Sequence, residues 1–344
     1  MNTLIETLDC AITNRISQPL VGRAYEEWKA RGLLTETQSF LSSLDSSKLP
    51  PVVHSFVTHV HKEKGLFLDL IGEDIGIDID ARKSLAMSAD ILWALSLMVD
   101  DIEDNDVVRG GLTSCWVEFG VEKTLEATNA SIKSLCKYLV NKTNLDVVPR
   151  SCMSYINIGL SSIREHGLMD LETPVGELVR NYERRCDFHG TFPLSVFAQL
   201  VLPDQQPKLN NAIAGLRLFN QGGQLINDLK DFVGGDLYGR SFSDIRRGVP
   251  TVPLSYLYHS LNDQDKKTFK SIYDKGVVTV EDRIVLAKLI ESSKVEENTL
   301  ARVKDCYNGV IKYLSQVVTT EHMDWFIDWA DYKINHLKQS LKHE

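Results

Sequence analysis

Residues 91–111, ILWALSLMVDDIEDNDVVRGG, join a nearly apolar run to the segment DDIEDND, in which five of seven residues are carboxylates. Like charges this close together destabilise a helix unless a cation offsets them. On a helix with about 100° per residue, Asp100 and Asp104 lie one turn apart and Asp101 lies beside them. Three carboxylates then share one space, an arrangement that suits Mg²⁺ and the phosphates of a substrate. A solvated acidic helix end is the alternative, which the apolar turn before it disfavours.

A second acidic segment, QGGQLINDLKDF, occupies residues 221–232. On a helix Asn227 and Asp231 are four positions apart and Asp228 is three before Asp231, so their oxygens share a face. N-D-x-x-D alone is common on helix surfaces. Two acidic faces on separate helices, however, could oppose each other across a bundle and bind Mg²⁺ between them. The pair of motifs therefore predicts a site for a diphosphate.

The rest of the 344-residue chain predicts helices. Prolines are absent from 52–148, and apolar residues recur at helical spacing over 279–290 and 307–318, whereas no convincing alternation of period two occurs. Proline and glycine breakers cut the sequence into about ten helices, with no Ser/Gly-rich linker. We therefore expect one all-α domain that covers residues 1–344.

Composition narrows the class of partner. The 38 Lys and Arg residues against 47 Asp and Glu give a net charge of −9, which argues against nucleic acid or an anionic membrane as the main partner. The six cysteines are scattered without C-x-x-C spacing, the start has no signal-peptide pattern, and the longest apolar run is far shorter than the roughly 20 residues that span a bilayer. We expect a cytoplasmic protein with reduced thiols and no stable membrane insertion.

The motifs resemble those of the trans-isoprenyl diphosphate synthases, the polyprenyl synthetase family. DDIED followed by Arg109 resembles the first aspartate-rich motif of the family, QLINDLKD its second, and GRSFSDIRRGVPTVPL and HGLMDL two further segments. The likeness runs from about residue 50 to 260. It implies an all-α isoprenoid synthase-type helical bundle around a central cavity, usually a homodimer. It also implies that Mg²⁺, as three ions, helps to remove diphosphate from an allylic prenyl diphosphate.

The motifs and the resemblance together assign roles to individual residues. The expected metal ligands are Asp100, Asp101, Asp104, Asn227, Asp228 and Asp231. The expected catalytic residues are Asp100, Asp101, Asp104, Asp228 and Trp93. The expected substrate-binding residues are Arg109, Arg240, Lys64, His61, Arg185, Leu95, Ser96 and Gln224.

The sequence departs from the family at the positions that hold isopentenyl diphosphate in chain-elongating members. The lysine and arginine of G-G-K-x-x-R align with His61 and Lys64, a His or Gln aligns with Trp93, and the second arginine of R-R-G aligns with Gly110. The allylic side has also changed, at His189, Gly190, Arg240 and Val249. Because both acidic motifs are intact, the resemblance implies that the diphosphate-ionising half is kept and the isopentenyl half is dismantled or repurposed.

Three further features bear on reaction and substrate. Trp93 offers an aromatic face that could stabilise a carbocation, with plain packing as the alternative. Leu95 and Ser96 stand where bulky aromatics close the prenyl tunnel in the family, which favours a C15 or C20 substrate over C10. A basic trio that could sense the leaving diphosphate, with a solvated surface as the commoner alternative, is Arg164, Arg184 and Arg185.

Three functions fit these features. The first is a terpene synthase, in which the cation left by diphosphate departure is cyclised or deprotonated. The second is prenyl transfer to isopentenyl diphosphate or to a different acceptor, such as a phosphorylated one held by His61, Lys62 and Lys64. The third is a non-catalytic partner subunit of a prenyl synthase, which the intact acidic motifs disfavour.

Overall fold

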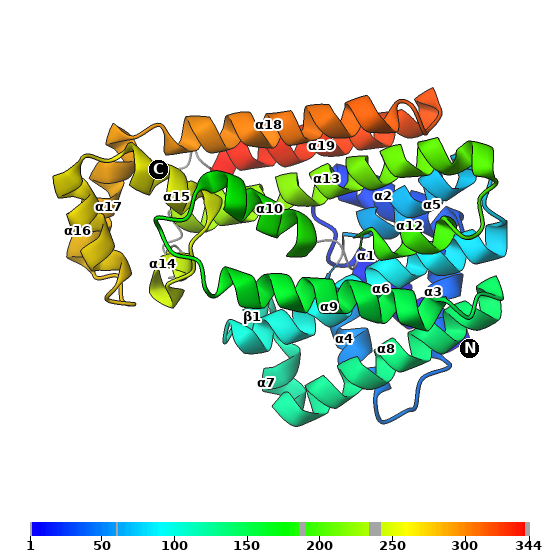
Figure 1. The fold of residues 1–344 in the computed structure, drawn as a ribbon. Helices are drawn as coiled ribbons and strands as arrows, with labels where there is room; N and C mark the ends of the chain where they lie inside the picture. Colours follow the sequence, from blue (N-terminus) through cyan, green and yellow to red (C-terminus); the bar gives the residue numbers. More distant parts are fainter. Residues whose placement is uncertain (1, 60, 186–189, 234–241, 341–344) are drawn as a thin grey trace. The chain divides into compact units, whose positions relative to one another are not determined.

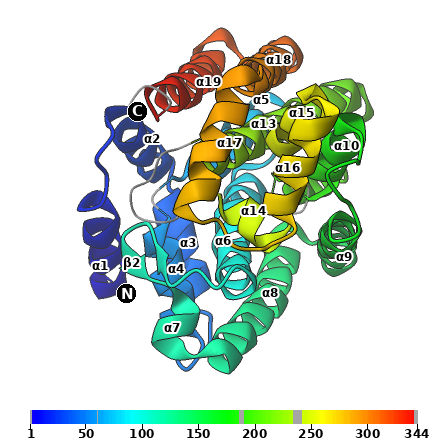
Figure 2. The same cartoon turned by 90° about the vertical axis from the view of Figure 1, so that its left-hand side faces the viewer.

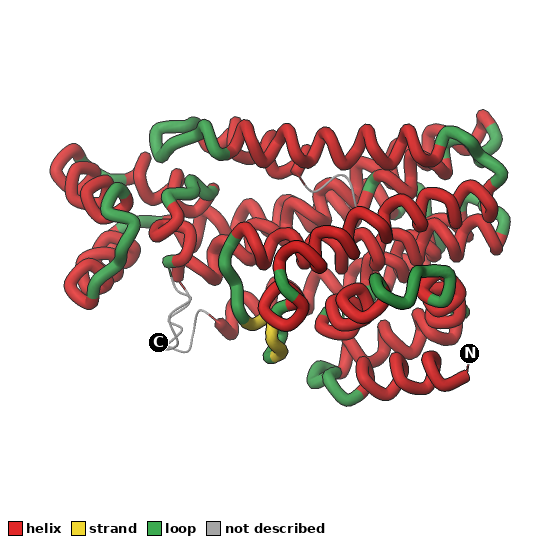
Figure 3. Tube along the Cα trace, turned by 90° about the horizontal axis from the view of Figure 1, so that it is seen from below, coloured by secondary structure: helices red, strands yellow, loops and turns green. Residues whose placement is uncertain are grey.

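The computed structural model describes residues 2–59, 61–185, 190–233 and 242–340. These residues form 18 α-helices, one short 3₁₀ turn, η1 (Pro203–Gln205), and one two-stranded hairpin (Figures 1 and 3). The predicted all-α class is confirmed. The helices outnumber the ten or so expected because short ones fill several connections, namely α7 (Cys115–Phe119), α12 (Phe192–Phe197) and α14 (Ser243–Arg247).

The chain groups into two compact units. Unit 1 comprises residues 1–155, 188–213 and 317–322, and unit 2 comprises residues 156–187, 214–316 and 323–344. Three long helices contribute residues to both units: α9 (Val148–His166), α13 (Gln206–Val233) and α19 (Thr320–Ser340). The single domain over residues 1–344 stays a prediction.

Unit 1 is built around α5 (Glu63–Asp74) and α6 (Ile79–Glu103). Residues 65–72 and 84–92 are buried without interruption, and a helix that is buried on all sides belongs at the centre of a bundle. Figure 2 shows α3 and α4 beside α6, in agreement with their contacts. The other helices of this unit are α1 (Asn2–Thr13), α2 (Pro19–Ala30), α3 (Leu33–Leu41), α4 (Leu49–Thr58), α7, α8 (Val121–Thr143) and α12.

A hairpin follows α6 and brings the chain back to the end of that helix. Its strands are β1 (Val108–Arg109) and β2 (Leu112–Thr113), with Arg109 paired to Leu112. Gly110 and Gly111 have φ values of +56° and +79°, as a type I′ turn requires at both central positions, and glycine adopts these values without strain. Each strand has only two residues, too few to produce an alternating pattern that sequence reading could detect.

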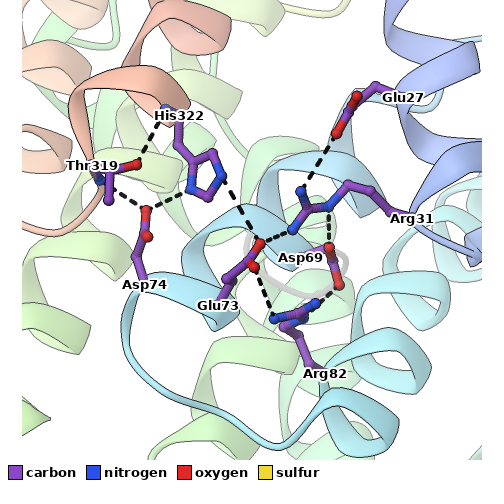
Figure 4. Close-up of polar contacts among 8 residues, drawn as sticks. All are labelled: Glu27, Arg31, Asp69, Glu73, Asp74, Arg82, Thr319 and His322. Carbon is purple, nitrogen blue, oxygen red and sulfur yellow. Dashed lines mark hydrogen bonds and ion pairs between the residues drawn. The ribbon is translucent and has the colours of Figure 1, made fainter.

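A buried ion network joins α2, α5 and α6 within unit 1 (Figure 4). The Asp69 carboxylate is fully buried and accepts hydrogen bonds from the guanidinium groups of Arg31 and Arg82, the latter at 2.9 Å. Two cations compensate a charge that would otherwise be costly to bury. At the end of α5, Asp74 Oδ2 lies 2.7 Å from His322 Nδ1, which fixes the start of α19 to this unit.

Unit 2 contains α10 (Val175–Arg185), α14, α15 (Val252–Ser260), α16 (Asp263–Tyr273), α17 (Val280–Ser292) and α18 (Val295–Leu314), with parts of α9, α13 and α19. Helices α13 and α18 approach closely because glycines line their contact. A Cβ atom at Gly222 would lie 3.2 Å from the ring of Tyr307, and one at Gly309 would lie 2.5 Å from Leu218. Helices α18 and α19 run side by side (Figures 1 and 2).

The described cysteines are free thiols, which are Cys10 at the surface and the buried Cys115, Cys136, Cys152 and Cys306. Cys186 lies outside the described residues. Within the described part of the chain, no helix is both long enough and apolar enough to cross a membrane.

Candidate active site

The first acidic motif ends α6 in unit 1. Asp101 is buried, Asp100 is half-buried, and Asp104 follows as the residue that caps the helix, its amide donating to the Asp100 carbonyl at 2.8 Å. The hairpin places the Arg109 guanidinium against the first two carboxylates. Its Nη2 lies 3.0 Å from Asp100 Oδ2 and its Nε donates to Asp101 Oδ1, while Asp106 Oδ2 is 3.6 Å from the same Nη2. The structure thus brings Asp100 and Asp101 together with Arg109, and the metal-binding and substrate-binding roles of these residues stay predictions.

At this motif burial and the neighbouring charges shift the pKa values of Asp101 and Arg109 in opposite directions. Burial raises the pKa of the Asp101 carboxyl, and the Arg109 charge opposes that rise. Burial alone would lower the pKa of Arg109, but the charges of Asp101 and Asp100 raise it overall. The guanidinium is therefore a permanent cation that compensates part of the negative charge at the end of α6.

The second acidic motif lies on α13 in unit 2, and Asp228 is its buried member. Asp228 Oδ2 accepts a hydrogen bond from the Tyr182 hydroxyl, and Oδ1 accepts one from Gln224 Nε2 at 2.8 Å. The Tyr182 oxygen in turn accepts from the Val252 amide at 3.1 Å. Asn227, which precedes Asp228, is exposed. Asp228 is therefore held by two neutral donors, and one of them is Gln224, whose predicted contact with substrate stays a prediction.

The Asp231 carboxylate caps a neighbouring helix. Its Oδ1 accepts from the Ser243 hydroxyl at 2.6 Å and its Oδ2 accepts from the Asp244 amide at 3.0 Å, so this carboxylate caps the first turn of α14. The Asp244 carboxylate pairs with Arg247 Nη2 at 2.8 Å. Asp244 is buried in the same region, and the acidic segment therefore has a third carboxylate besides Asp228 and Asp231.

These three carboxylates are difficult to ionise together. Burial raises the pKa of Asp228 to about 6, because the hydrogen bonds from Tyr182 and Gln224 only partly oppose it. Burial also raises the pKa of Asp231, and burial together with the charges of Asp228 and Asp231 raises that of Asp244 well above its usual range. Burial therefore favours the protonated form of each of these carboxyls, and the charge of Arg185 opposes this at Asp228 and Asp244.

Arg185, in the last turn of α10, is the predicted basic residue that lies near this acid. Its charge lowers the pKa values of Asp228 and Asp244, and its Nη1 lies 3.5 Å from Nδ1 of His166. Arg164 and Arg184 are exposed, and Arg184 pairs with a surface glutamate. Two positions discussed in the sequence analysis, His189 and Arg240, lie outside the described part of the chain.

Three of the altered acceptor positions lie in one cluster in unit 1. The Lys64 ammonium is 4.1 Å from the centroid of the Trp93 ring, and His59, 5.5 Å from that ring, lies 5.9 Å from His61. A cation thus already covers one face of Trp93. The Lys62 ammonium is instead engaged with the backbone, because its buried Nζ donates to the carbonyls of residues 56 and 59 at 2.8 and 2.6 Å.

The positions expected to bound the prenyl tunnel also lie on α6. Leu95 is buried, and half-buried Ser96 donates to the Trp93 carbonyl at 2.8 Å. Neither side chain is a bulky aromatic, as the sequence already indicated. Their contact with a prenyl chain remains a prediction.

Sequence reasoning missed three polar residues at these motifs. Tyr182 binds Asp228 from α10, Asp244 joins the acid of α13, and Arg15 donates through Nη2 to the Gly110 carbonyl. A Cβ at Gly110 would lie 3.2 Å from that Arg15 nitrogen. Only Asp244 had a signal, because it follows the second motif in the quoted segment GRSFSDIRRG. Tyr182 is 46 positions from Asp228 and Arg15 is 95 positions from Gly110, so no local sequence pattern could have indicated these contacts.

Within the described residues, no group of three or more His, Cys, Asp and Glu side chains converges as a ready metal site. The first motif contributes three carboxylates around Arg109, those of Asp100, Asp101 and Asp106, and the second contributes carboxylates that accept hydrogen bonds from neutral groups. The predicted metal ligands therefore stay predictions.

Comparison with known proteins agrees with the all-α fold. A family model described as polyprenyl synthetase matches residues 63–290. A curated relative, dolasta-1(15),8-diene synthase of Colletotrichum gloeosporioides, is 22% identical over 259 residues, which are 70% of this chain and 34% of that protein. The chain thus spans about a third of the length of this relative.

Solved structures show the same fold at low identity. The polyprenyl synthase of Caulobacter crescentus CB15, complexed with calcium and isoprenyl diphosphate, is 16% identical with a TM-score of 0.79, over 91% of this chain and 97% of that one. The decaprenyl diphosphate synthase of Rhodobacter capsulatus is 13% identical with a TM-score of 0.80, over 92% and 99%.

Proposed function

The chain belongs to the polyprenyl synthetase family, and on this premise we propose that it removes diphosphate from an allylic prenyl diphosphate and forms a cyclised or deprotonated terpene. The observation that carries the proposal is the group of carboxyls formed by Asp228 and Asp231 on α13 and Asp244 on α14, whose pKa values are all raised by burial. Buried carboxylates of this kind favour a bound cation, and a cation attracts a diphosphate.

The proposed ligand atoms are of the type that Mg²⁺ prefers. The proposed ligands offer only oxygen atoms, and they are Asp100, Asp101, Asp104, Asn227, Asp228 and Asp231. Mg²⁺ is usually bound by one or two carboxylates together with the phosphates of the substrate, so a ready group of three protein ligands is not required. When bound, as three ions by the family resemblance, Mg²⁺ would stabilise the negative charge of the departing diphosphate.

The cations of the chain would position that diphosphate. Arg109 lies against Asp100 and Asp101, and Arg185 lies near Asp228. A guanidinium binds two phosphate oxygens at once, which orients the leaving group as well as attracting it. We propose the same role for Arg240.

The prenyl chain would contact the apolar face of α6. Leu95 and Ser96 lie within two turns before the acidic motif, and neither has the aromatic ring that would close the prenyl tunnel. This supports a C15 or C20 substrate over C10. An apolar surrounding also keeps water from the carbocation before it cyclises or loses a proton.

The contacts of Trp93 support a synthase. In this chain the Trp93 ring and the Lys64 ammonium occupy two positions that bind isopentenyl diphosphate in elongating members, and they contact each other. A filled acceptor position favours a reaction within one prenyl chain. The name of the curated relative, a diene synthase, agrees with this proposal.

A second candidate is prenyl transfer to a phosphorylated acceptor. The observation in its favour is Arg15, whose guanidinium lies at Gly110, where elongating members have an arginine side chain. Together with His61 and Lys64, Arg15 would supply positive charge for an acceptor phosphate.

One assay separates the candidates. The purified chain is incubated with Mg²⁺ and geranyl, farnesyl or geranylgeranyl diphosphate, with and without isopentenyl diphosphate. We expect a hydrocarbon or alcohol from the C15 or C20 substrate alone. A longer diphosphate that forms only with isopentenyl diphosphate would favour the second candidate. The absence of turnover with every combination would contradict the proposal and favour a partner subunit.

A pair of variants tests whether both motifs serve the same step. Asp101→Asn and Asp228→Asn should each reduce turnover strongly, and the double variant should be little worse than either one, because residues that act as a unit are not additive. Exposed Asp204 provides a matched control, Asp204→Asn, which should leave turnover unchanged. Independent, multiplicative losses in the double variant would contradict a shared step.

A further inference from the structure

His166, the last residue of α9, is buried and uses both ring nitrogens. Its Nε2 lies 2.6 Å from the Pro250 carbonyl oxygen. A carbonyl can only accept a hydrogen bond, so Nε2 carries the proton. In the neutral ring Nδ1 is then an acceptor, and Arg185 Nη1 lies 3.5 Å from it. Burial and the Arg185 charge both lower the pKa of His166, which favours this neutral ring.

The groups around His166 lead directly to the acid of α13. The Tyr182 ring meets the imidazole edge to face, with centroids 6.3 Å apart, and its hydroxyl donates to Asp228. Close to Pro250 in the chain, the Val252 amide donates to that same hydroxyl. Arg185 is three residues after Tyr182 on α10, so both residues face the region of Asp228.

We infer that His166 is a positioning residue that holds the Arg185 guanidinium toward Asp228, so that this cation meets the diphosphate of the substrate. The inference rests on the proposed function for the identity of that anion. Loss of the acceptor at Nδ1 removes this contact and loosens the orientation of the guanidinium, so that it binds a diphosphate less well.

Two substitutions distinguish a positioning role of His166 from a packing role, because each keeps only one of the two hydrogen-bonding functions of the imidazole. His166→Asn retains an acceptor near Nδ1 for Arg185 and loses the bond to Pro250. His166→Gln retains a donor near Nε2 for Pro250 and loses the acceptor. If His166 only packs, His166→Gln should be the milder change, whereas positioning predicts that His166→Asn is milder.

The measurement is the affinity of the full chain for inorganic pyrophosphate in the presence of Mg²⁺, by titration calorimetry. We expect His166→Gln to weaken it about tenfold, equivalent to about 1.4 kcal/mol, and His166→Asn by less than about threefold. The effect of His166→Gln should vanish in an Arg185→Ala background, because the two residues act through one contact. Arg180→Ala, which changes an exposed arginine on the same helix, is the control. Equal losses in both His166 variants, or an unchanged effect without Arg185, would overturn the inference.

A second readout does not depend on the ligand. NMR of the ring nitrogens of His166 in the full chain should show Nε2 protonated and Nδ1 unprotonated at neutral pH, with the Nδ1 signal shifted in Arg185→Ala. The opposite tautomer would overturn the inference even if pyrophosphate binds. If the wild-type chain binds no pyrophosphate, the proposed function is contradicted, and the ring tautomer still decides whether His166 holds Arg185.

Discussion

At the first acidic motif a cation contacts two carboxylates, since Arg109 lies against Asp100 and Asp101. At the second motif the closest partners of Asp228 are the neutral donors Tyr182 and Gln224. Neutral donors stabilise a carboxylate but leave its charge in place, whereas a guanidinium compensates it. The difference indicates that α13 gains more than α6 from a bound cation, and that its charge depends more on pH.

The largest expected effect comes from Asp228→Asn. Turnover should fall by at least about a hundredfold, because a group that stabilises the departing charge is lost. The free energy of unfolding at pH 7 should stay equal or rise, because the variant removes a buried charge whose pKa is raised. Product formation and denaturant unfolding measure the two effects.

The control for this variant is Asp204→Asn, at an exposed position. This control should change neither turnover nor the free energy of unfolding. A stability loss of more than about 1 kcal/mol in Asp228→Asn would mean that the hydrogen bonds of the carboxylate outweigh its burial, and the contrast between the motifs would fail.

The next effect has the opposite sign. Arg109→Met should destabilise the chain by about 2 kcal/mol at pH 7, because it leaves the buried Asp101 without its cation. The loss should shrink on acidification, as Asp101 takes up a proton. Denaturant unfolding at several pH values measures it, with Arg184→Met as the exposed control. An unchanged stability would show that Arg109 does not compensate the motif.

The contrast between the motifs also marks what a sequence can predict. The spacing within DDIED and NDLKD is local, so the periodicity of a helix was enough to place Asp100 and Asp101 together and Asp228 near Asp231. The helical class was predictable for the same reason. Arg109 was predictable only as a neighbour in sequence, and the Gly110-Gly111 turn explains why it returns to α6.

The partners that decide the electrostatics were not predictable. Tyr182 reaches Asp228 from 46 positions away, and Arg15 reaches Gly110 from 95 positions away, so only the packing of helices brings them together. The orientation of Lys62 is another example. The sequence suggests Lys62 as a ligand of an acceptor phosphate, yet its ammonium is buried against backbone carbonyls, because the end of α4 offers hydrogen-bond acceptors that charge counting does not reveal.

The smallest expected effect, and the one that sharpens the comparison most directly, comes from Tyr182→Phe. The hydroxyl lowers the pKa of Asp228, which burial has raised to about 6, so its removal should raise that pKa further, by about half a unit to one unit. A raised acid pKa means that the folded chain holds the proton more tightly than the unfolded one. This group therefore contributes a stability that is lost as pH rises from about 4 to about 6.

Pyrophosphate binding with Mg²⁺ should show the reverse trend, because it needs the ionised carboxylate. In the wild-type chain the affinity should rise through about pH 6, and in Tyr182→Phe the midpoint should move to higher pH. The same titration on Tyr258→Phe, whose hydroxyl contacts a surface glutamate, is the control and should leave the midpoint in place. If Tyr182→Phe does not shift the midpoint, Asp228 is not the group that titrates, and the second motif is no more sensitive to pH than the first.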